Sequence, residues 1–263
     1  MIERWQRIVP TELNYSLEGP DGAPVIGFTG SLGTDLTFWQ PQSGRLGERF
    51  RTLRYDIRGH GSSPVPPAPY SMSDLGTDLV ALLDRHEIEQ VLLCGLSIGG
   101  MISMWVAAHA PERVERLVLC CTSAQLGPPE SWHERAATVR ANGVGAVADA
   151  VLGRWFTPGF AAARPEEIER MRGILTATPP EGYAGCCEAI AEMDLSPDLP
   201  SIGAPTLVIA GEQDPSTPPE HGRRIADLIP GALFEVVSPA AHLATIERPD
   251  LTTAMILRFL TQS

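Results

Sequence analysis

The chain has 263 residues, of which 43% are hydrophobic, and it carries a formal net charge of −12. This length suits one large domain, or one domain with a sizeable insertion, and the apolar fraction excludes a disordered chain. The negative charge argues against nucleic acid or an anionic membrane as the main partner, so an anionic ligand would require a local cluster of arginines.

Short apolar runs alternate with longer helical patterns along most of the chain, an order typical of a parallel sheet built from βαβ units. We expect an antiparallel pair of strands within residues 7–18. A helix is predicted over residues 73–86, because leucines recur there at helical spacing, and Ser73 is its predicted N-cap without a full capping box. Further strands are predicted at residues 25–29, 51–56, 90–96, 115–121, 206–211 and 232–237.

The alternation stops between residues 122 and 200, where no strand is predicted. Segments rich in glycine and proline divide this interval into three or four short helices: Gly127-Pro128-Pro129, Thr157-Pro158-Gly159 and Thr178-Pro179-Pro180. An insertion that leaves from the carboxyl end of a strand would lie over the edge where open parallel sheets bind ligands. We therefore predict a core domain of residues 1–121 and 201–263 and a helical cap of residues 122–200.

A candidate nucleophile lies where the strand at residues 90–96 meets a helix predicted over residues 101–110, in the sequence Gly95-Leu96-Ser97-Ile98-Gly99. A serine on so tight a strand-to-helix turn is held in a strained conformation, which leaves no room for bulky side chains two residues away. The alternative is a glycine-rich turn with an incidental serine, but the strand before it and the helix after it favour the catalytic interpretation. We predict that Ser97 is the nucleophile and that the N–H of Ile98 is one oxyanion donor.

A nucleophilic serine needs a base, and the base needs a carboxylate to orient it. Where the nucleophile lies on a strand-to-helix turn of this kind, the order along the chain is serine, then acid, then histidine. His242 lies in a small-residue loop after the last predicted strand, and Asp214 lies in the loop after the strand before it. Glu212 competes for the acid role, but Pro215 and the turn residues after it favour Asp214. We predict ordinary surface or core positions for the other histidines after the serine, which are His109, His133 and His221.

The second oxyanion donor is expected in the loop after the first parallel strand. This loop contains Gly30-Ser31-Leu32-Gly33, and its small residues let the backbone approach a substrate closely. From its place in the loop, we predict the N–H of Leu32 as the donor.

These motifs resemble the α/β-hydrolase family across almost the whole chain, and two further segments support the resemblance: Asp56-Ile57-Arg58-Gly59-His60-Gly61-Ser62-Ser63 and Gly211-Glu212-Gln213-Asp214. Within that family the chain is most similar to the 3-oxoadipate enol-lactonases, through Ser31-Leu32-Gly33-Thr34-Asp35, Cys121-Thr122-Ser123-Ala124, Trp132-His133-Glu134-Arg135 and Arg154-Trp155-Phe156-Thr157-Pro158. One departure is Gly30, where those lactonases usually have asparagine. The resemblance implies a mostly parallel eight-stranded sheet with helices on both faces and a helical cap.

The resemblance also implies the hydrolysis of a five-membered enol-lactone that bears an acetate side chain, late in the breakdown of protocatechuate and catechol, without a metal or an organic cofactor. The free carboxylate of such a small-molecule substrate requires a cation, and arginine is the usual partner. Arg135 and Arg154 are our candidates, because each neighbours a tryptophan, Trp132 and Trp155, in a segment similar to the lactonases.

Two other functions are compatible with these motifs. A general carboxylesterase or a perhydrolase would keep the triad and accept neutral esters under the cap. A small-molecule receptor would keep the fold and bind without turnover, but an intact triad argues against it.

The five cysteines are Cys94 and the adjacent pairs Cys120–Cys121 and Cys186–Cys187. An odd number without framework spacing predicts reduced thiols in a cytoplasmic protein, and the absence of a CxxC pair predicts that they bind no metal. The amino-terminal residues lack the apolar stretch of a signal peptide, and no run of about 18 apolar residues predicts a membrane-spanning helix.

Overall fold

The computed structural model describes residues 9–261, and within them seven strands form one sheet in the order β1-β3-β2-β4-β5-β6-β7. Strand β1 runs antiparallel to β3, and all other neighbours are parallel. The strands are β1 (Tyr15–Glu18), β2 (Val25–Thr29), β3 (Arg51–Tyr55), β4 (Val91–Leu96), β5 (Val114–Cys120), β6 (Thr206–Gly211) and β7 (Leu233–Val237).

All six predicted parallel strands are confirmed to within one residue at each end. The expected antiparallel pair within residues 7–18 is wrong for the described part, which contains only β1, while residues 7 and 8 lie outside it. The sheet of the described residues therefore has seven strands instead of eight. Upstream of β1 the backbone bonds to side chains, since the N–H of Thr11 donates to Asp78 and that of Asn14 donates to Ser63.

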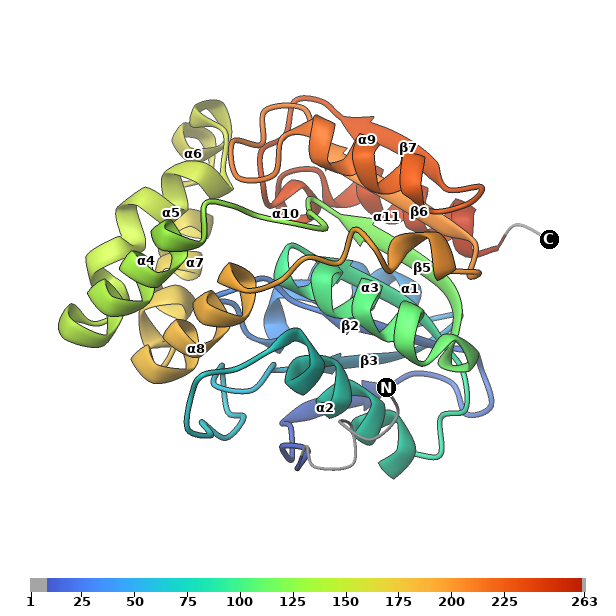
Figure 1. Ribbon diagram of the computed structural model, residues 1–263. Coiled ribbons are helices and arrows are strands. Elements are labelled where there is room, and N and C mark those ends of the chain that lie inside the picture. Colours follow the sequence, from blue (N-terminus) through green and yellow to red (C-terminus); the bar gives the residue numbers. More distant parts are fainter. Residues whose placement is uncertain (1–8, 262–263) are drawn as a thin grey trace.

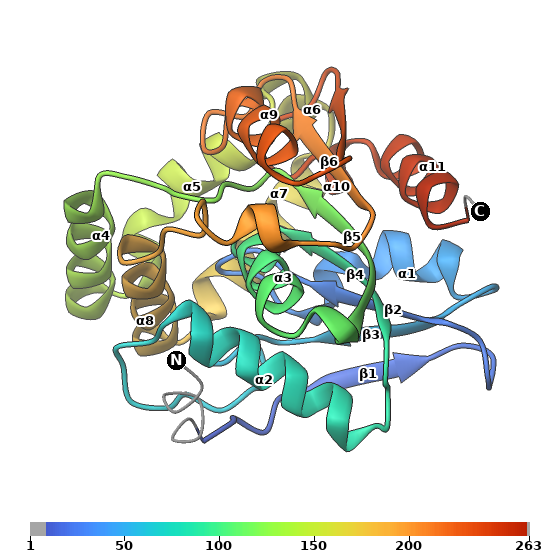
Figure 2. The same cartoon turned by 45° about the vertical axis from the view of Figure 1, so that its right-hand side comes forward.

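Helices cover both faces of the sheet, as expected (Figures 1 and 2). On one face α2 packs against α3, with α9 beside β6, and on the other face α1 packs against α11. Their bounds are α1 (Gln40–Leu46), α2 (Met72–Arg85), α3 (Ile98–His109), α9 (Pro219–Leu228) and α11 (Pro249–Leu260), and the short helix α10 (Ala244–Glu247) precedes α11.

The start of α2 corrects one prediction. The N-cap is Ser71 and not Ser73, and it forms a full capping box with Asp74. The Asp74 N–H donates to the Ser71 hydroxyl, and the Asp74 carboxylate accepts from the Ser71 N–H at 2.9 Å. An aspartate therefore completes a capping box here, at the position where glutamate or glutamine is usual. The predicted apolar stripe of this helix, Leu75, Leu79, Leu82 and Leu83, is buried.

Residues 121–205, all of them described, contain no strand and form a group of helices at one end of the molecule (Figure 1). We call helices α4 to α8 the cap helices: α4 (Pro129–Asn142), α5 (Ala148–Trp155), α6 (Pro158–Ala163), α7 (Pro165–Ala177) and α8 (Pro180–Ala191). The expectation of three or four helices is wrong, because Pro165 begins a helix of its own and Gly143, at φ +76°, separates α4 from the segment that follows. The division into core and cap at residues 122–200 stays a prediction.

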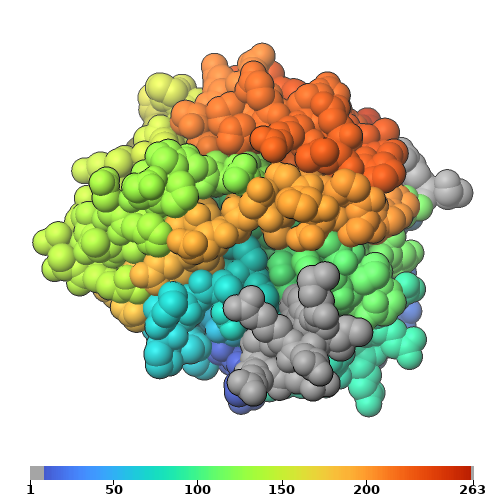
Figure 3. All heavy atoms as spheres, in the orientation of Figure 1, coloured from blue at the N-terminus to red at the C-terminus, as the bar shows by residue number. Residues whose placement is uncertain are grey.

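The cap helices and the carboxyl-terminal elements form one continuous surface on the face shown in Figure 3.

All five cysteines are buried and unbridged. Within the described part of the chain, every helix is too short or too polar to cross a lipid bilayer.

Candidate active site

Ser97 lies between the end of β4 and the start of α3, and its backbone is strained at φ 57° and ψ −122°. For a residue other than glycine this conformation is unfavourable and persists only where neighbouring contacts impose it. Two hydrogen bonds do so here. The Ser97 N–H donates to the Cys120 carbonyl at 3.0 Å, and the Thr122 hydroxyl donates to the Ser97 carbonyl at 2.7 Å. The neighbouring strand β5 therefore holds the turn in shape.

The two glycines around Ser97 are required by close packing. A Cβ atom on Gly95 would clash with the Gly99 carbonyl, and a Cβ atom on Gly99 would clash with the carbonyl oxygens of Thr29 and Gly30. The spacing of the motif thus follows from the contact between the start of α3 and the end of β2.

His242 and Asp214 meet at the carboxyl edge of the sheet. The Nδ1 atom of His242 lies 2.8 Å from Oδ2 of Asp214, and both side chains are buried. Asp214 also accepts hydrogen bonds from the N–H groups of Ser216 and Thr217 at 2.8 and 3.1 Å, and from the Thr217 hydroxyl at 2.7 Å. Because Asp214 occupies Nδ1, the Nε2 atom is the ring nitrogen available to a nucleophile.

The Asp214 carboxyl is held in its charged form. Burial acts to raise its pKa, but the charge and hydrogen bond of His242, together with the hydrogen bonds from Thr217, outweigh burial and lower the pKa below its usual value. An ionised acid at this position stabilises a protonated imidazole, which is what the base becomes when it takes a proton from serine.

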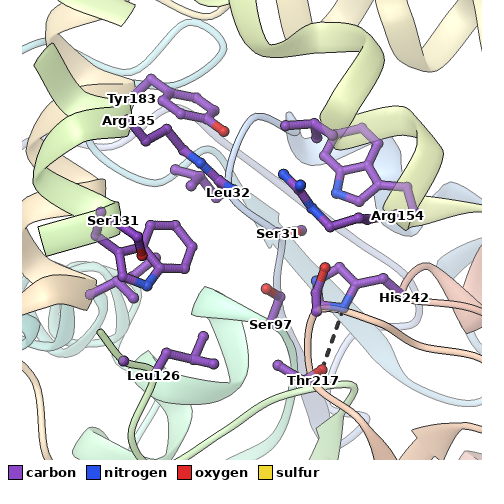
Figure 4. Close-up of a pocket in the computed structure, with 16 residues that line it drawn as sticks. Ser31, Leu32, Ser97, Leu126, Ser131, Arg135, Arg154, Tyr183, Thr217 and His242 are labelled. Carbon is purple, nitrogen blue, oxygen red and sulfur yellow. Dashed lines mark hydrogen bonds between the residues drawn. The ribbon is translucent and has the colours of Figure 1, made fainter. Parts of the chain in front are cut away.

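Ser97 and His242 line one pocket of about 240 Å³ beneath the cap helices, and Figure 4 shows the two side chains in the same part of it. The two side chains, both within the described residues, are not hydrogen-bonded to each other, which is common before substrate binds. The dashed line in Figure 4 is the 3.4 Å contact between the Thr217 hydroxyl and Nδ1 of His242.

The rival candidates lie elsewhere. Glu212 is exposed and accepts a hydrogen bond from the Ser238 hydroxyl. The other histidines contact groups outside the pocket: His109 the Trp105 carbonyl, His133 the Glu192 carboxylate and His221 the Ser123 hydroxyl.

One of the two predicted oxyanion donors lines this pocket, and the other directly follows Ser97. Ile98 is the first residue of α3, directly after Ser97, and Leu32 lines the pocket from the loop after β2. Neither N–H has a hydrogen-bond acceptor among residues 9–261. The Leu32 loop keeps its shape because the N–H and hydroxyl of Thr34 both donate to the Ser31 carbonyl, at 3.1 and 2.8 Å. Their role as oxyanion donors stays a prediction.

The cap side of the pocket is cationic. Arg135 from α4 and Arg154 from α5 both line it, together with Trp132 and Trp155. The Arg135 guanidinium lies over the Trp132 ring, 4.6 Å from its centroid. Burial, and next the charge of Arg135, lower the pKa of Arg154. Like charges held together where solvent is partly excluded are unfavourable until an anion joins them.

These two arginines differ from the others on the cap helices and the residues joining them. Among residues 9–261 neither has a carboxylate within 4.0 Å, whereas the other four form ion pairs: Arg140 with Glu181 and Glu188, Arg164 with Glu166, Arg170 with Glu167, and Arg172 with Asp149 and Glu169. In a protein with a net charge of −12, two uncompensated cations facing one pocket point to an anionic ligand.

Sequence reasoning missed several residues of the site, and Thr217 and Tyr183 are the two that matter most here. Thr217 holds Asp214, and its signal was available, because a threonine shortly after an aspartate often closes a turn. Tyr183 lines the pocket from α8, and burial, before any other cause, raises the pKa of its phenol. No sequence motif predicts this position, because the packing of α8 on α4 brings Tyr183 to the pocket. Within the described residues no group of three or more histidine, cysteine, aspartate or glutamate side chains is arranged to hold a metal ion.

Comparison with known proteins finds a matching family and similar relatives. The family model described as the alpha/beta hydrolase fold matches residues 25–249. The protein 3-oxoadipate enol-lactonase 2 of Acinetobacter baylyi is 41% identical over 238 residues, which are 90% of this chain and 89% of that protein.

Two solved structures are similar as well. The enol-lactonase from Burkholderia xenovorans LB400 superposes with a TM-score of 0.94 at 43% identity, over 96% of this chain and 97% of that one. A thermophilic esterase from Thermogutta terrifontis, with malate bound, superposes with a TM-score of 0.90 at 32% identity, over 94% and 92% of the two chains.

Proposed function

Because the chain belongs to the alpha/beta hydrolase fold family and is a hydrolytic enzyme, we propose that it hydrolyses 3-oxoadipate enol-lactone to 3-oxoadipate in the degradation of aromatic compounds. One observation carries the proposal: a single pocket holds Ser97, His242 and two arginines that have no carboxylate partner among the described residues. The relatives named enol-lactonases support it, at 41% and 43% identity.

The proposed reaction needs only groups of this chain and water. His242 takes the proton of the Ser97 hydroxyl as the serine oxygen attacks the lactone carbonyl, and Asp214 stabilises the imidazolium. The N–H groups of Ile98 and Leu32 hold the oxyanion. The ring carbon–oxygen bond then breaks, and the ring oxygen leaves as an enolate that takes the proton from His242 and becomes a ketone. His242, neutral again, deprotonates water, which attacks the acyl group, and the proton returns to Ser97 as the new carboxylate leaves.

The free carboxylate of the substrate would bind between Arg135 and Arg154. The tryptophan rings beside them, Trp132 and Trp155, and the apolar Val151 form walls suited to a small planar ring. Burial, and next the charge of Arg135, lower the pKa of Arg154, and an anion here would offset that second cause. A general esterase with the same triad would use these walls without the cations, which makes carboxylate recognition the feature that separates the two functions.

Arg154→Ala and Arg135→Ala are each expected to raise KM for the enol-lactone about tenfold to a hundredfold and to leave KM for a neutral ester unchanged. A hydrogen bond to a charged group contributes about 1.5–3 kcal/mol, and about 1.4 kcal/mol corresponds to a factor of ten. The measurement is steady-state kinetics on the lactone and on a neutral ester of similar size.

Arg172→Ala is the matched control, because Arg172 lies on α7, pairs with Asp149 and Glu169, and does not line the pocket. If the single variants and their double variant treat acid and neutral ester alike, the arginines do not recognise the carboxylate and the enzyme is a general esterase.

A further inference from the structure

Glu247 ends the short helix α10, five residues after His242, and is only 7% exposed. No arginine, lysine or histidine among residues 9–261 forms an ion pair with it. A buried carboxylate without a cation is costly unless hydrogen bonds satisfy its oxygens.

Glu247 has three hydrogen-bond donors, from two distant parts of the chain. The Ala241 N–H donates to Oε1 at 2.8 Å, and the Thr157 N–H donates to the same oxygen at 3.2 Å. The Thr157 hydroxyl donates to Oε2 at 2.7 Å. Ala241 directly precedes His242, and Thr157 follows α5 and begins α6 as its N-cap. One carboxylate thus joins the histidine loop to the cap helices.

A further hydrogen bond joins the same two segments through the residue that follows His242. The Leu243 N–H donates to the Trp155 carbonyl at 2.9 Å. Both neighbours of His242 in sequence are therefore tied, directly or through Glu247, to residues 155–157, which directly follow Arg154. In Figure 4 Arg154 and His242 lie on the same side of the pocket.

We propose that Glu247 is a positioning residue that fixes the His242 loop and the Arg154–Thr157 segment as one unit. The base and one of the substrate-binding cations are then placed together. A displacement of about 1 Å at a reacting group lowers the rate about a hundredfold, so this placement matters for catalysis. The effect on Arg154 rests on the proposed function, whereas the effect on His242 applies to any ester that the triad hydrolyses.

Glu247→Ala would leave two N–H groups and a hydroxyl without their acceptor. We expect kcat per titrated active site on 4-nitrophenyl acetate to fall about tenfold to a hundredfold. On the enol-lactone we expect a similar fall in kcat and an additional rise in KM, because Arg154 moves too. Glu247→Gln should retain most of the wild-type kcat, since its single amide oxygen can take the place of Oε1 and accept both N–H groups.

A residue that only stabilises the fold would lower the melting temperature without changing these constants. Thr157→Val removes one buried hydroxyl from the link and should lower kcat. Its matched control is Thr252→Val, because Thr252 is buried in α11 and its hydroxyl donates to the Arg248 carbonyl at 2.9 Å and not to the Glu247 carboxylate. That variant should keep the wild-type constants.

Wild-type kcat per titrated site in Glu247→Ala, on the ester and on the lactone, would overturn the proposal even if the protein melts earlier. If Glu247→Ala does not fold, Thr157→Val decides, and wild-type constants in that variant would equally overturn it. An enzyme that leaves the lactone intact would contradict the proposed function alone, because kcat on 4-nitrophenyl acetate still tests the role of Glu247.

Discussion

Ser97→Ala is expected to lower kcat for hydrolysis about a millionfold while the protein keeps its fold. The hydroxyl is the only group removed, and the bonds that shape the turn use the backbone N–H and carbonyl of residue 97, which alanine retains. The measurement is kcat on the lactone and on an activated ester, with circular dichroism to show that the variant is folded.

Ser103→Ala is the matched control for this substitution. Ser103 lies on α3, which begins directly after Ser97, is fully buried, and donates to the Gly99 carbonyl at 2.7 Å without lining the pocket. Its kcat should stay close to that of the wild type. A Ser97→Ala protein that retains a tenth of the activity would show that another residue attacks the substrate.

Asp214→Asn is expected to lower kcat about ten-thousandfold with little change in KM. A neutral amide no longer stabilises the imidazolium, and its NH₂ group can face Nδ1 and favour the wrong tautomer. The N–H groups of Ser216 and Thr217 donate to Oδ1 and should still hold the side chain in place, so the loss reflects the changed charge and tautomer and not unfolding. Single-turnover kinetics on an activated ester would measure it.

The control here is Glu212→Gln, which alters the exposed acid two positions earlier, bonded to Ser238. It should retain wild-type kcat. Unchanged kcat in Asp214→Asn, combined with a large loss in Glu212→Gln, would transfer the acid role to Glu212.

The core of the fold was predictable from local patterns because parallel strands are short apolar runs between helices. Strands such as Thr206–Gly211 come from residues adjacent in sequence, and the chain order then places the residues after them at one edge. The positions of Ser97, Asp214 and His242 around a common pocket follow from that rule. Their catalytic roles remain predictions until the variants are measured.

The features that the sequence did not reveal depend on contacts between distant segments. Tyr183 reaches the pocket only because α8 packs on α4, and Glu247 meets Thr157 across 90 positions of sequence. Neither residue belongs to a local motif that would single it out. The arginines were better candidates because each neighbours a tryptophan, yet their lack of carboxylate partners among the described residues became visible only in three dimensions.

A direct turnover assay tests whether the enzyme acts on a carboxylate-bearing enol-lactone. The wild-type protein would be given the enol-lactone, generated in situ, and a neutral ester of similar size, with loss of each followed spectrophotometrically. We predict a kcat/KM for the lactone above about 10⁴ M⁻¹s⁻¹, at least about tenfold above that for the ester, as expected when a charged contact contributes more than about 1.4 kcal/mol. Rapid hydrolysis of the ester with no loss of the lactone would contradict the proposed enol-lactone hydrolysis.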